Sequence, residues 1–296
     1  MKLGVLRFSA LGDLALAMPY LRALTVKPVV LTMPLGQALL GDEFESFVIM
    51  KDKSVLSQAR FVLALRRERF DALADLQSND RTRVMTRLAG AGRVFDRTFE
   101  AHVHPAAEAW QRILEPSGLL GPLDLAFAPK PRDYIALNVG SSAAWLSKRL
   151  PDAKWREISA RLHDRFGLPF VLTGSAEERA YVARVAGQLA GKAENRAGKT
   201  SVQELKRLLA GAFLTVSTDS AAMQISAAMK TPTIGLFGAT NWVRSAPFGP
   251  WSRTVYDRTF YPDGQPPAEN TRECLPCYDH IDIAEALDEL KPYLNG

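Results

Sequence analysis

The chain has 296 residues, of which 47% are hydrophobic and 23% are charged. A chain of this length and composition can bury substantial cores, so we exclude a disordered protein and expect two domains. The 37 Lys and Arg against 32 Asp and Glu give a net charge of +5, which suits an anionic ligand or an anionic membrane surface. No run of Lys and Arg interleaved with aromatic residues occurs, so we expect no nucleic-acid partner.

Cysteine content and apolar runs bear on the location of the protein. The sequence contains two Cys, too few for a secreted disulfide scaffold. Arg7 and Asp13 interrupt the apolar N-terminal stretch, and no clean small-residue cleavage site follows, so it is not typical of a signal peptide. No apolar run approaches the roughly 18–20 residues needed to cross a bilayer. We therefore expect a cytoplasmic protein.

Strands and helices alternate along the first part of the chain. Buried strands are predicted over residues 3–8, 29–33, 46–50 and 71–76. A helix with apolar residues at helical spacing follows the first strand, and further helices are predicted over 55–69 and 106–114. Strands and helices that alternate at this length predict βαβ units and a mainly parallel sheet.

The alternation stops at residues 118–133, which contain two Gly and three Pro and have no clear periodicity, as expected of a linker. It then resumes, with strands predicted over 134–139, 168–174, 213–219 and 231–238. Helices are predicted over 155–166, 177–189, 201–211 and 281–294, and the chain after Pro250 is predicted to be rich in loops up to the last helix. Ser201 and Glu204 form a capping box that opens one of these helices.

These elements predict an α/β protein with two Rossmann-like domains. We place the domains at 1–125 and 126–280, followed by a C-terminal helix over 281–296 that could pack back toward the first domain. Two such halves bind their ligand in a central cleft, outside the carboxyl ends of the strands. A Rossmann dehydrogenase is disfavoured because no G-x-G-x-x-G follows the first strand.

Six sequence blocks carry a resemblance to a known family. They are RFSALGDLALAMP (7–19), the stretches 70–94 and 138–158, VLTGSAEER (171–179), the stretch 197–240 and CLPC (274–277). In this order they resemble the heptosyltransferases of glycosyltransferase family 9. The resemblance implies a GT-B fold, with the nucleotide-sugar donor on the second domain and the acceptor on the first. It also implies transfer of a heptose from ADP-heptose to the inner core of lipopolysaccharide, with inversion and without metal or cofactor.

Asp13 follows Gly12 where the first strand gives way to a helix. An Asp at a helix start accepts backbone N–H bonds and suits the positive end of the helix dipole, so a helix cap is one interpretation. A carboxylate at the carboxyl end of a strand can also take a proton from a sugar hydroxyl. The resemblance assigns Asp13 as this catalytic base, and the two roles are compatible at different oxygens.

Lys148 lies in a stretch of small residues that ends before Pro151 opens a helix. A leaving diphosphate must be stabilised by cations and backbone N–H groups when no metal is present. The resemblance assigns Lys148 to the diphosphate and places Ser141 and Ser142 in the phosphate-side turn. The alternative is an ordinary solvated lysine.

A second phosphate element is predicted where a strand ends and the free N–H groups of a short helix begin. Its members, which the resemblance assigns to donor binding, are Thr218, Asp219, Ser220, Ala221, Ala222 and Gln224. The family often has Gly and His where this chain has Ala221 and Gln224. Because Gln224 cannot carry charge or shuttle a proton, either that histidine is not essential or donor use or activity is altered.

The remaining candidate residues have weaker signals. Glu177 follows a strand end, where an acid commonly binds ribose hydroxyls, although an acid in the first turn of a helix is an equal alternative and Glu178 is a second choice. The acceptor side is assigned to Ser9, Gly12, Arg81 and His104. Cys274, Cys277 and His280 hint at a metal site, but no fourth ligand is evident, so we expect plain thiols.

We therefore expect an inverting, metal-independent glycosyltransferase. Its expected partners are ADP-heptose and a lipid A–core acceptor at the membrane surface, and we expect a monomer, cytoplasmic and peripheral to the inner membrane. One alternative is a family member with another nucleotide sugar or acceptor. Another is a catalytically weak homologue that only binds a sugar nucleotide.

Overall fold

The computed structural model describes residues 1–97, 105–129 and 132–294. The chain divides into two compact units, residues 1–124 and 125–296, and the division falls inside the stretch predicted as a linker. Each unit contains one parallel sheet with helices between its strands, as predicted. None of the helices in the described ranges combines the length and the apolar content that a membrane crossing requires.

The first unit is built on a five-stranded sheet in the order β3-β2-β1-β4-β5. The bounds of these strands are β1 (Leu3–Leu6), β2 (Val29–Thr32), β3 (Phe47–Ile49), β4 (Ala72–Asp75) and β5 (Arg93–Phe95). Every neighbouring pair is parallel, with Leu6 opposite both Leu31 and Asp75. The order reverses between β1 and β4, so the loops that follow these two strands flank the switch point of the sheet.

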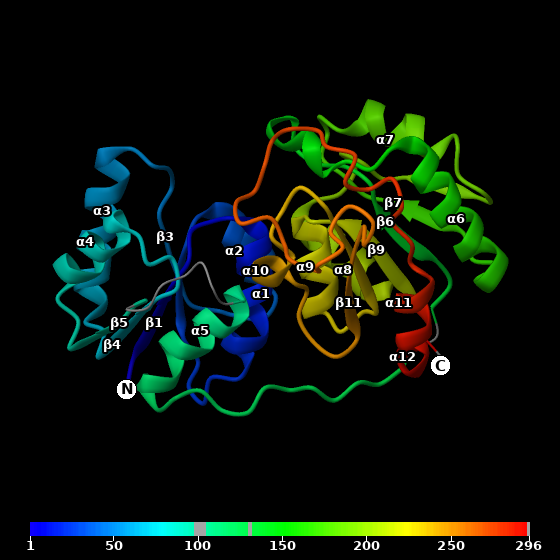
Figure 1. Ribbon diagram of the computed structural model, residues 1–296. Helices are drawn as coiled ribbons and strands as arrows, with labels where there is room; N and C mark the ends of the chain where they lie inside the picture. The colour runs from blue at the N-terminus through cyan, green and yellow to red at the C-terminus, as the bar shows by residue number, and fades with distance from the viewer. Residues whose placement is uncertain (98–104, 130–131, 295–296) are drawn as a thin grey trace. The chain divides into compact units, whose positions relative to one another are not determined.

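Helices cover both faces of this sheet. They are α1 (Leu11–Arg22), α2 (Pro34–Leu40), α3 (Val55–Glu68), α4 (Asp80–Ala89) and α5 (Ala106–Leu114), followed by the short η1 (Glu115–Ser117). Because crossovers between parallel strands are right-handed, the reversal puts α1 and α2 on one face and α3 and α4 on the other, and α5 joins α1 (Figure 1). Helices α3 and α4 pack on the sheet through the buried side chains of Phe61, Leu65, Met85 and Ala89.

The second unit is built on a six-stranded parallel sheet in the order β11-β10-β9-β6-β7-β8. Its strands are β6 (Ile135–Asn138), β7 (Phe170–Leu172), β8 (Ala193–Asn195), β9 (Leu214–Thr218), β10 (Thr233–Phe237) and β11 (Ser252–Tyr256). The order reverses between β6 and β9, where Asn138 lies opposite Ser217. The loops after β6 and β9 therefore flank the switch point of this sheet.

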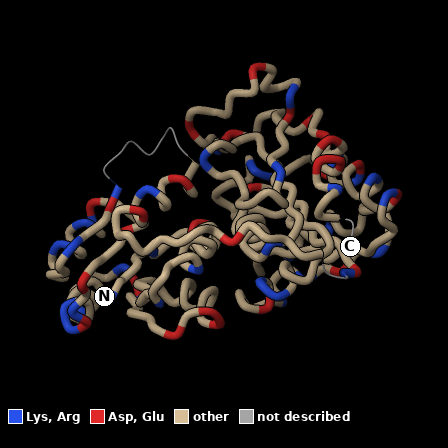
Figure 2. Tube along the Cα trace, turned by 90° about the horizontal axis from the view of Figure 1, so that it is seen from below, with Lys and Arg blue, Asp and Glu red and all other residues tan. Residues whose placement is uncertain are grey.

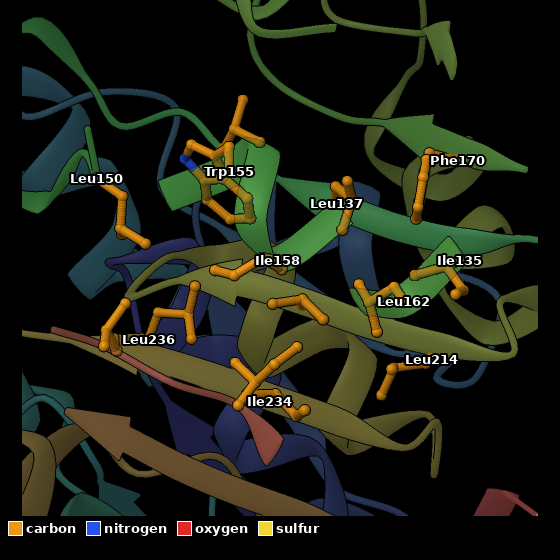
Figure 3. Packing of buried hydrophobic residues seen from close by; sticks show 14 of the residues in the cluster. Ile135, Leu137, Leu150, Trp155, Ile158, Leu162, Phe170, Leu214, Ile234 and Leu236 are labelled. Carbon is orange, nitrogen blue, oxygen red and sulfur yellow. The ribbon is translucent and has the colours of Figure 1, made fainter. Parts of the chain in front are cut away.

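The larger core cluster of the second unit lies between its sheet and the helices of one face, and a smaller cluster of Met223, Phe237 and Trp242 packs separately. The helices of the unit are η2 (Ala143–Lys148), α6 (Asp152–Phe166), α7 (Arg179–Ala186), α8 (Val202–Gly211), α9 (Ala221–Ala228), α10 (Trp242–Ser245), α11 (Ala284–Glu289) and α12 (Lys291–Leu294). Trp155, Ile158 and Leu162 recur on one side of α6 and pack on the buried side chains of the sheet (Figure 3). The apolar residues that predicted this helix from the sequence are therefore the ones that pack it on the sheet.

Two expectations for the C-terminal region differ from the structure. The chain after Pro250 is not only loop, because β11 pairs with β10 along its whole length. The helix expected over 281–294 is divided into α11 and α12, and the buried Leu287, Leu290 and Leu294 belong to the core of the second unit. The alternating polar and apolar residues of β11 were too few to stand out in the sequence.

Candidate functional site

The candidate residues lie at the carboxyl ends of the parallel strands in each unit. In the first unit they follow β1 and β4, and in the second they follow β6, β7 and β9. Parallel sheets bind ligands at this edge, beside the switch point, because the loops there diverge and leave a crevice. Each unit therefore carries its own group of candidate residues, and we describe the two groups separately.

Asp13 is the third residue of α1, and its side chain is 35% exposed. Its Oδ2 accepts hydrogen bonds from the Ala10 backbone N–H at 3.1 Å and from Arg7 Nη2 at 2.5 Å. Within the described ranges, Oδ1 accepts no hydrogen bond. The carboxylate thus caps the helix with one oxygen and leaves the other available to take a proton, which is the arrangement that a general base needs.

Arg7 fixes this carboxylate in place, a role that the sequence analysis did not assign. Its guanidinium donates from Nη1 to the Leu76 carbonyl at 2.6 Å, and it lies 5.7 Å from the centre of the Trp110 ring. The side chain is 12% exposed, so water screens the ion pair with Asp13 only weakly. Arg7 belongs to the N-terminal motif, and its place just before the helix start was the available signal.

A pocket of about 390 Å³ opens at the same edge of the first sheet. Ser9 and Arg81 line it together with Lys53 and Gln77. Gln77 links the two loops of the switch point, because its Oε1 accepts the backbone N–H groups of Phe8 and Ser9 at 3.2 and 3.3 Å. Ser9 and Arg81 are thus brought together as expected for one binding site.

The other two residues assigned to the acceptor side, Gly12 and His104, are not among the residues that line this pocket in the described ranges. Gly12 lies in the first turn of α1, one residue before Asp13. His104 lies outside the described residues.

In the second unit, Lys148 forms an ion pair with Asp219. Lys148 Nζ lies 2.8 Å from Asp219 Oδ2, and the two side chains are 17% and 13% exposed. The pair joins the end of η2, which follows β6, to the residue after β9, so it spans the switch point. The ammonium also lies 5.2 Å from the centre of the Trp145 ring. Lys148 is therefore a positioned cation and not an ordinary solvated lysine.

The loop after β6 is fixed by its own polar contacts. Ser141 Oγ donates to the Trp145 carbonyl at 2.6 Å, and Arg149 Nη2 donates to the Ser141 carbonyl at 2.7 Å. Arg149 lies 4.1 Å from the centre of the Tyr181 ring, and burial raises the pKa of Tyr181 to about 12. Ser142 is exposed in the same loop. Ser141 thus shapes the turn, whereas Ser142 is open to solvent.

A second set of hydrogen bonds ties the ends of β6, β7 and β9 together. Asn138 Nδ2 donates to Ser220 Oγ, and Thr173 Oγ1 donates to Asn138 Oδ1, each at 3.0 Å. Thr218 Oγ1 donates to the Gly140 carbonyl at 2.8 Å. Asn138, Thr173 and Thr218 are buried, and these hydrogen bonds hold the loops at the ends of the three strands together.

Helix α9 starts within this network. Ser220 is its N-cap but makes no capping bond with its side chain, so the first backbone N–H groups, around Ala221 and Ala222, keep their capacity to donate to an anion. Gln224 is buried and donates from Nε2 to the Ser245 carbonyl at 2.7 Å. Its Oε1 is buried without a partner among the described residues.

The two neighbouring acids after β7 are placed differently. Glu177 is exposed. Glu178 is half-buried, accepts the Ser175 N–H at 2.7 Å through Oε2, and presents Oε1 to the space where a Cβ on Gly140 would stand. The structure therefore places Glu178 nearer to the β6 loop than Glu177, which the sequence analysis had ranked first.

The two cysteines differ in their surroundings. Cys274 is exposed, whereas Cys277 is buried, and burial raises the pKa of the Cys277 thiol to about 11. His280 Nδ1 lies 3.4 Å from the buried Asp257 carboxylate. Among the described residues no group of three or more His, Cys, Asp and Glu side chains is arranged to hold a metal ion.

The chain is similar in sequence to the members of a known protein family. The sequence model of glycosyltransferase family 9 (heptosyltransferase) matches residues 100–265. Lipopolysaccharide heptosyltransferase 1 of Pseudomonas aeruginosa is 35% identical over 119 residues, which are 40% of this chain and 32% of that protein. Lipopolysaccharide heptosyltransferase 3 of Escherichia coli K12 is 31% identical over 153 residues, or 51% and 40% of the two chains. The matches therefore span less than half the length of these curated relatives.

Solved structures resemble the fold over most of the chain. A family 9 glycosyl transferase from Veillonella parvula has a TM-score of 0.72 at 18% identity and covers 89% of this chain and 88% of its own. The E. coli heptosyltransferase WaaC with ADP has a TM-score of 0.71 at 19% identity, with 86% and 92% covered. These likenesses confirm the predicted GT-B fold class with its two Rossmann-like sheets.

Proposed function

Because the chain belongs to glycosyltransferase family 9, the heptosyltransferases, we propose that it transfers a heptose from ADP-heptose to the inner core of lipopolysaccharide. Two observations support this proposal. Asp13 is held by Arg7 with one oxygen free, and a positioned cation and a helix N-terminus meet at the switch point of the second sheet. The first suits activation of a sugar hydroxyl, and the second suits a diphosphate.

Asp13 is the proposed general base. The proton of the acceptor hydroxyl passes to Asp13 Oδ1 while the hydroxyl oxygen forms a bond to the anomeric carbon of the heptose. The bond from that carbon to the diphosphate oxygen breaks, and ADP leaves with the electron pair. A single displacement of this kind inverts the configuration at the anomeric carbon. The pocket lined by Ser9 and Arg81 is the proposed acceptor site.

Lys148 and the start of α9 are proposed to hold the diphosphate. As ADP leaves, its phosphate oxygens gain negative charge, and fixed donors aimed at those oxygens lower the barrier without reorganising. Lys148 is held by Asp219 before the donor arrives, so little side-chain entropy is lost on binding. In this proposal the enzyme needs neither a metal ion nor a cofactor besides the nucleotide sugar.

The proposed acceptor, a lipid A–core molecule, is anchored in a membrane. We therefore propose that the protein acts in the cytoplasm as a monomer, peripheral to the inner membrane. The donor-binding residues proposed in the second unit include Glu177 or its neighbour Glu178 for the ribose hydroxyls.

Gln224 supports a second candidate function, a homologue that binds a sugar nucleotide but transfers its sugar slowly or not at all. Its amide is tied to the Ser245 carbonyl and cannot carry a charge or a labile proton near neutral pH. If a charged group at this position is needed in the chemical step, binding persists and turnover is lost.

Calorimetric titration with ADP, UDP, GDP and NAD tests the donor site. We expect ADP to bind more tightly than UDP, GDP and NAD. Replacement of Lys148 by Ala should weaken ADP binding at least tenfold, because a hydrogen bond to a charged group contributes about 1.5–3 kcal/mol. Lys192→Ala, which removes an exposed lysine elsewhere in the second unit, should bind ADP as the wild type does. Equal affinity for the three nucleoside diphosphates, or unchanged binding in Lys148→Ala, would contradict the proposal.

A further inference from the structure

Exposed apolar side chains gather on one side of the first unit. Of the twelve large hydrophobic side chains that are exposed in the described ranges, six lie between residues 51 and 95. They are Val55, Leu56 and Leu63 on α3, Val84 and Leu88 on α4, and Val94 on β5. Val55, Leu56, Leu63 and Val84 are each more than half exposed, at 83%, 60%, 53% and 54%. Single exposed apolar residues are ordinary, but a cluster on adjacent helices marks a contact surface.

The positive charge of the chain gathers in the same segment. Residues 51–95 contain ten Lys and Arg against five Asp and Glu, a difference of +5 that equals the net charge of the whole chain. Two of the five acids are neutralised or hidden, because Glu68 pairs with Lys2 and Asp75 is buried. Among the arginines of the segment, Arg83 pairs with Asp96 just beyond it. In Figure 2, blue segments gather at the end of the first unit that carries α3 and α4.

The helical period interleaves the two kinds of side chain on α3. Phe61 and Leu65 face the sheet, so Leu56 and Leu63 point outward, and Arg60 and Arg67 fall on the same stripe. Neither arginine has a carboxylate partner among the described residues. Arg66 Nε donates to the Leu88 carbonyl at 2.7 Å, which ties the end of α3 to the end of α4.

We propose that the outer face of α3 and α4 is the surface by which the protein docks on an anionic lipid bilayer. Apolar side chains flanked by arginines on a helix that lies flat are suited to a membrane interface, where the apolar groups enter the acyl boundary and the guanidinium groups meet lipid phosphates. An acidic protein partner would also bury Val55 and Leu56, so binding to anionic vesicles that carry no protein decides between the two.

The docking face continues into the proposed acceptor pocket. Lys53 and Arg81 line that pocket and also belong to the basic segment of residues 51–95. Arg81 lies in the first turn of α4, about one helical turn before Val84. A lipid-anchored acceptor would therefore reach the pocket without leaving the bilayer surface. The inference deepens the proposed function, on which it rests for the membrane-borne acceptor.

Sedimentation with vesicles that contain no acceptor tests the docking face, so its result does not depend on transferase activity. We expect the intact protein to bind phosphatidylcholine vesicles that contain about one third phosphatidylglycerol and not vesicles of phosphatidylcholine alone. Raising the salt from about 0.1 M to about 0.5 M should release much of it, because the Debye length shortens.

Variants of α3 test the two kinds of side chain separately. Arg60→Gln/Arg67→Gln should lower the partition coefficient roughly 30-fold, and Leu56→Ser/Leu63→Ser should lower it at least about tenfold.

Matched variants separate this face from a general loss of charge or of apolar surface. Arg156→Gln/Arg207→Gln removes the same charge from exposed positions on α6 and α8, and Leu35→Ser removes an exposed leucine from α2. Both should bind vesicles as the wild type does, and circular dichroism should show all variants folded. The proposal is overturned if the wild type does not bind anionic vesicles, if the α3 variants bind as tightly as the wild type, or if the matched variants lose as much.

Discussion

At the scale of single residues, the Asp13 carboxylate has two hydrogen-bond partners on one oxygen, and its other oxygen is the one proposed to take the proton. Asp13 Oδ2 receives both the Ala10 N–H and Arg7, so the helix cap and the ion pair share an oxygen. A cap at one oxygen and a base at the other are compatible, as predicted from the sequence, because both contacts are made by Oδ2 and Oδ1 is left to act as the base. Arg7 is then a positioning residue that acts through Asp13.

Replacement of Arg7 by Gln should lower kcat about 10- to 100-fold, because a base that loses its orientation reaches the acceptor hydroxyl less often. The KM for the donor should stay within about twofold, since Arg7 belongs to the unit that is not proposed to bind it. Arg7→Lys, which keeps the charge, should recover part of the loss. Steady-state kinetics with both substrates varied tests this, and an equal loss in Arg7→Lys and Arg7→Gln would argue for a purely steric role.

The surroundings of a second residue, Asp75, predict how the stability of the fold depends on pH. It ends β4 and is fully buried, and its Oδ1 accepts the backbone N–H groups of Gln77 and Ser78 at 3.0 and 2.9 Å. Oδ2 is buried without a hydrogen-bond partner among the described residues. Burial raises the pKa of this carboxyl above its ordinary value of 3.8.

Because the pKa of Asp75 is higher in the folded state than in the unfolded state, the folded state binds more protons over the interval between the two values. The stability that this carboxyl contributes is therefore present below pH 3.8 and is lost as the pH rises through the folded pKa. Asp75→Asn, which does not ionise, should gain stability relative to the wild type as the pH rises from 4. Each unit of pKa shift corresponds to about 1.4 kcal/mol. Urea unfolding across this range tests it, and a constant difference between the two proteins would refute it.

At the scale of elements, the turn between β8 and α8 has two structural features, a capping box and a closely packed glycine. Ser201 and Glu204 form the predicted capping box, since Ser201 Oγ accepts the Glu204 N–H at 3.3 Å and Glu204 Oε2 accepts the Ser201 N–H at 2.7 Å. Gly198, three residues earlier, has a φ of +65°, and a Cβ there would stand 2.6 Å from the Ala176 Cα. The turn therefore packs tightly on the loop after β7.

Gly198→Ala should destabilise the second unit by about 2–4 kcal/mol, from the left-handed backbone and the clash together. Gly167→Ala is the matched control, because Gly167 also has a φ of +65° but has open space around its Cα. It should cost about 1–2 kcal/mol. Urea unfolding of the two variants measures the difference. Equal losses would show that the contact with Ala176 adds nothing.

The elements differ in how far the sequence predicts them. The central strands β1, β6, β9 and β10 are buried along their whole length. In β1, β6 and β10 most residues are apolar, so these strands stand out in the sequence, whereas β9 (LTVST) is recognised by its β-branched residues. The edge strand β8 consists of Ala193, Glu194 and Asn195, with none of them fully buried. A short edge strand is held by pairing with its neighbour and not by its own side chains, which leaves no pattern to find.

At the scale of the whole molecule, the order of the motifs predicted the family and the GT-B fold, while the contacts within the site came from the structure. Lys148 and Asp219 were each assigned to donor binding, but their ion pair joins residues 71 positions apart. Such a pair depends on β6 and β9 being neighbours in the sheet, which spacing along the chain does not reveal. The same applies to Arg7 and the Leu76 carbonyl, which meet because β1 pairs with β4.

The docking face of α3 and α4 also belongs to this scale. The sequence predicts a helix over 55–69 that is charged on one face, and α3 confirms this helix. That Leu56 and Leu63 lie on the same outward stripe as Arg60 and Arg67 follows only from the structure, which shows that Phe61 and Leu65 face the sheet. In the sequence, nothing distinguishes Leu56 and Leu63 from the buried leucines of other helices, although both are exposed.

The transfer reaction itself tests the account most directly. Wild-type protein and Asp13→Asn are incubated with ADP-heptose and a lipid A–core acceptor, and the product is followed by mass spectrometry. We predict that the wild type adds one heptose, and that Asp13→Asn binds ADP-heptose normally but turns over about 10²–10⁴ times more slowly. A wild type that binds ADP-heptose and transfers no sugar, or an Asp13→Asn variant with near-normal turnover, would contradict the account.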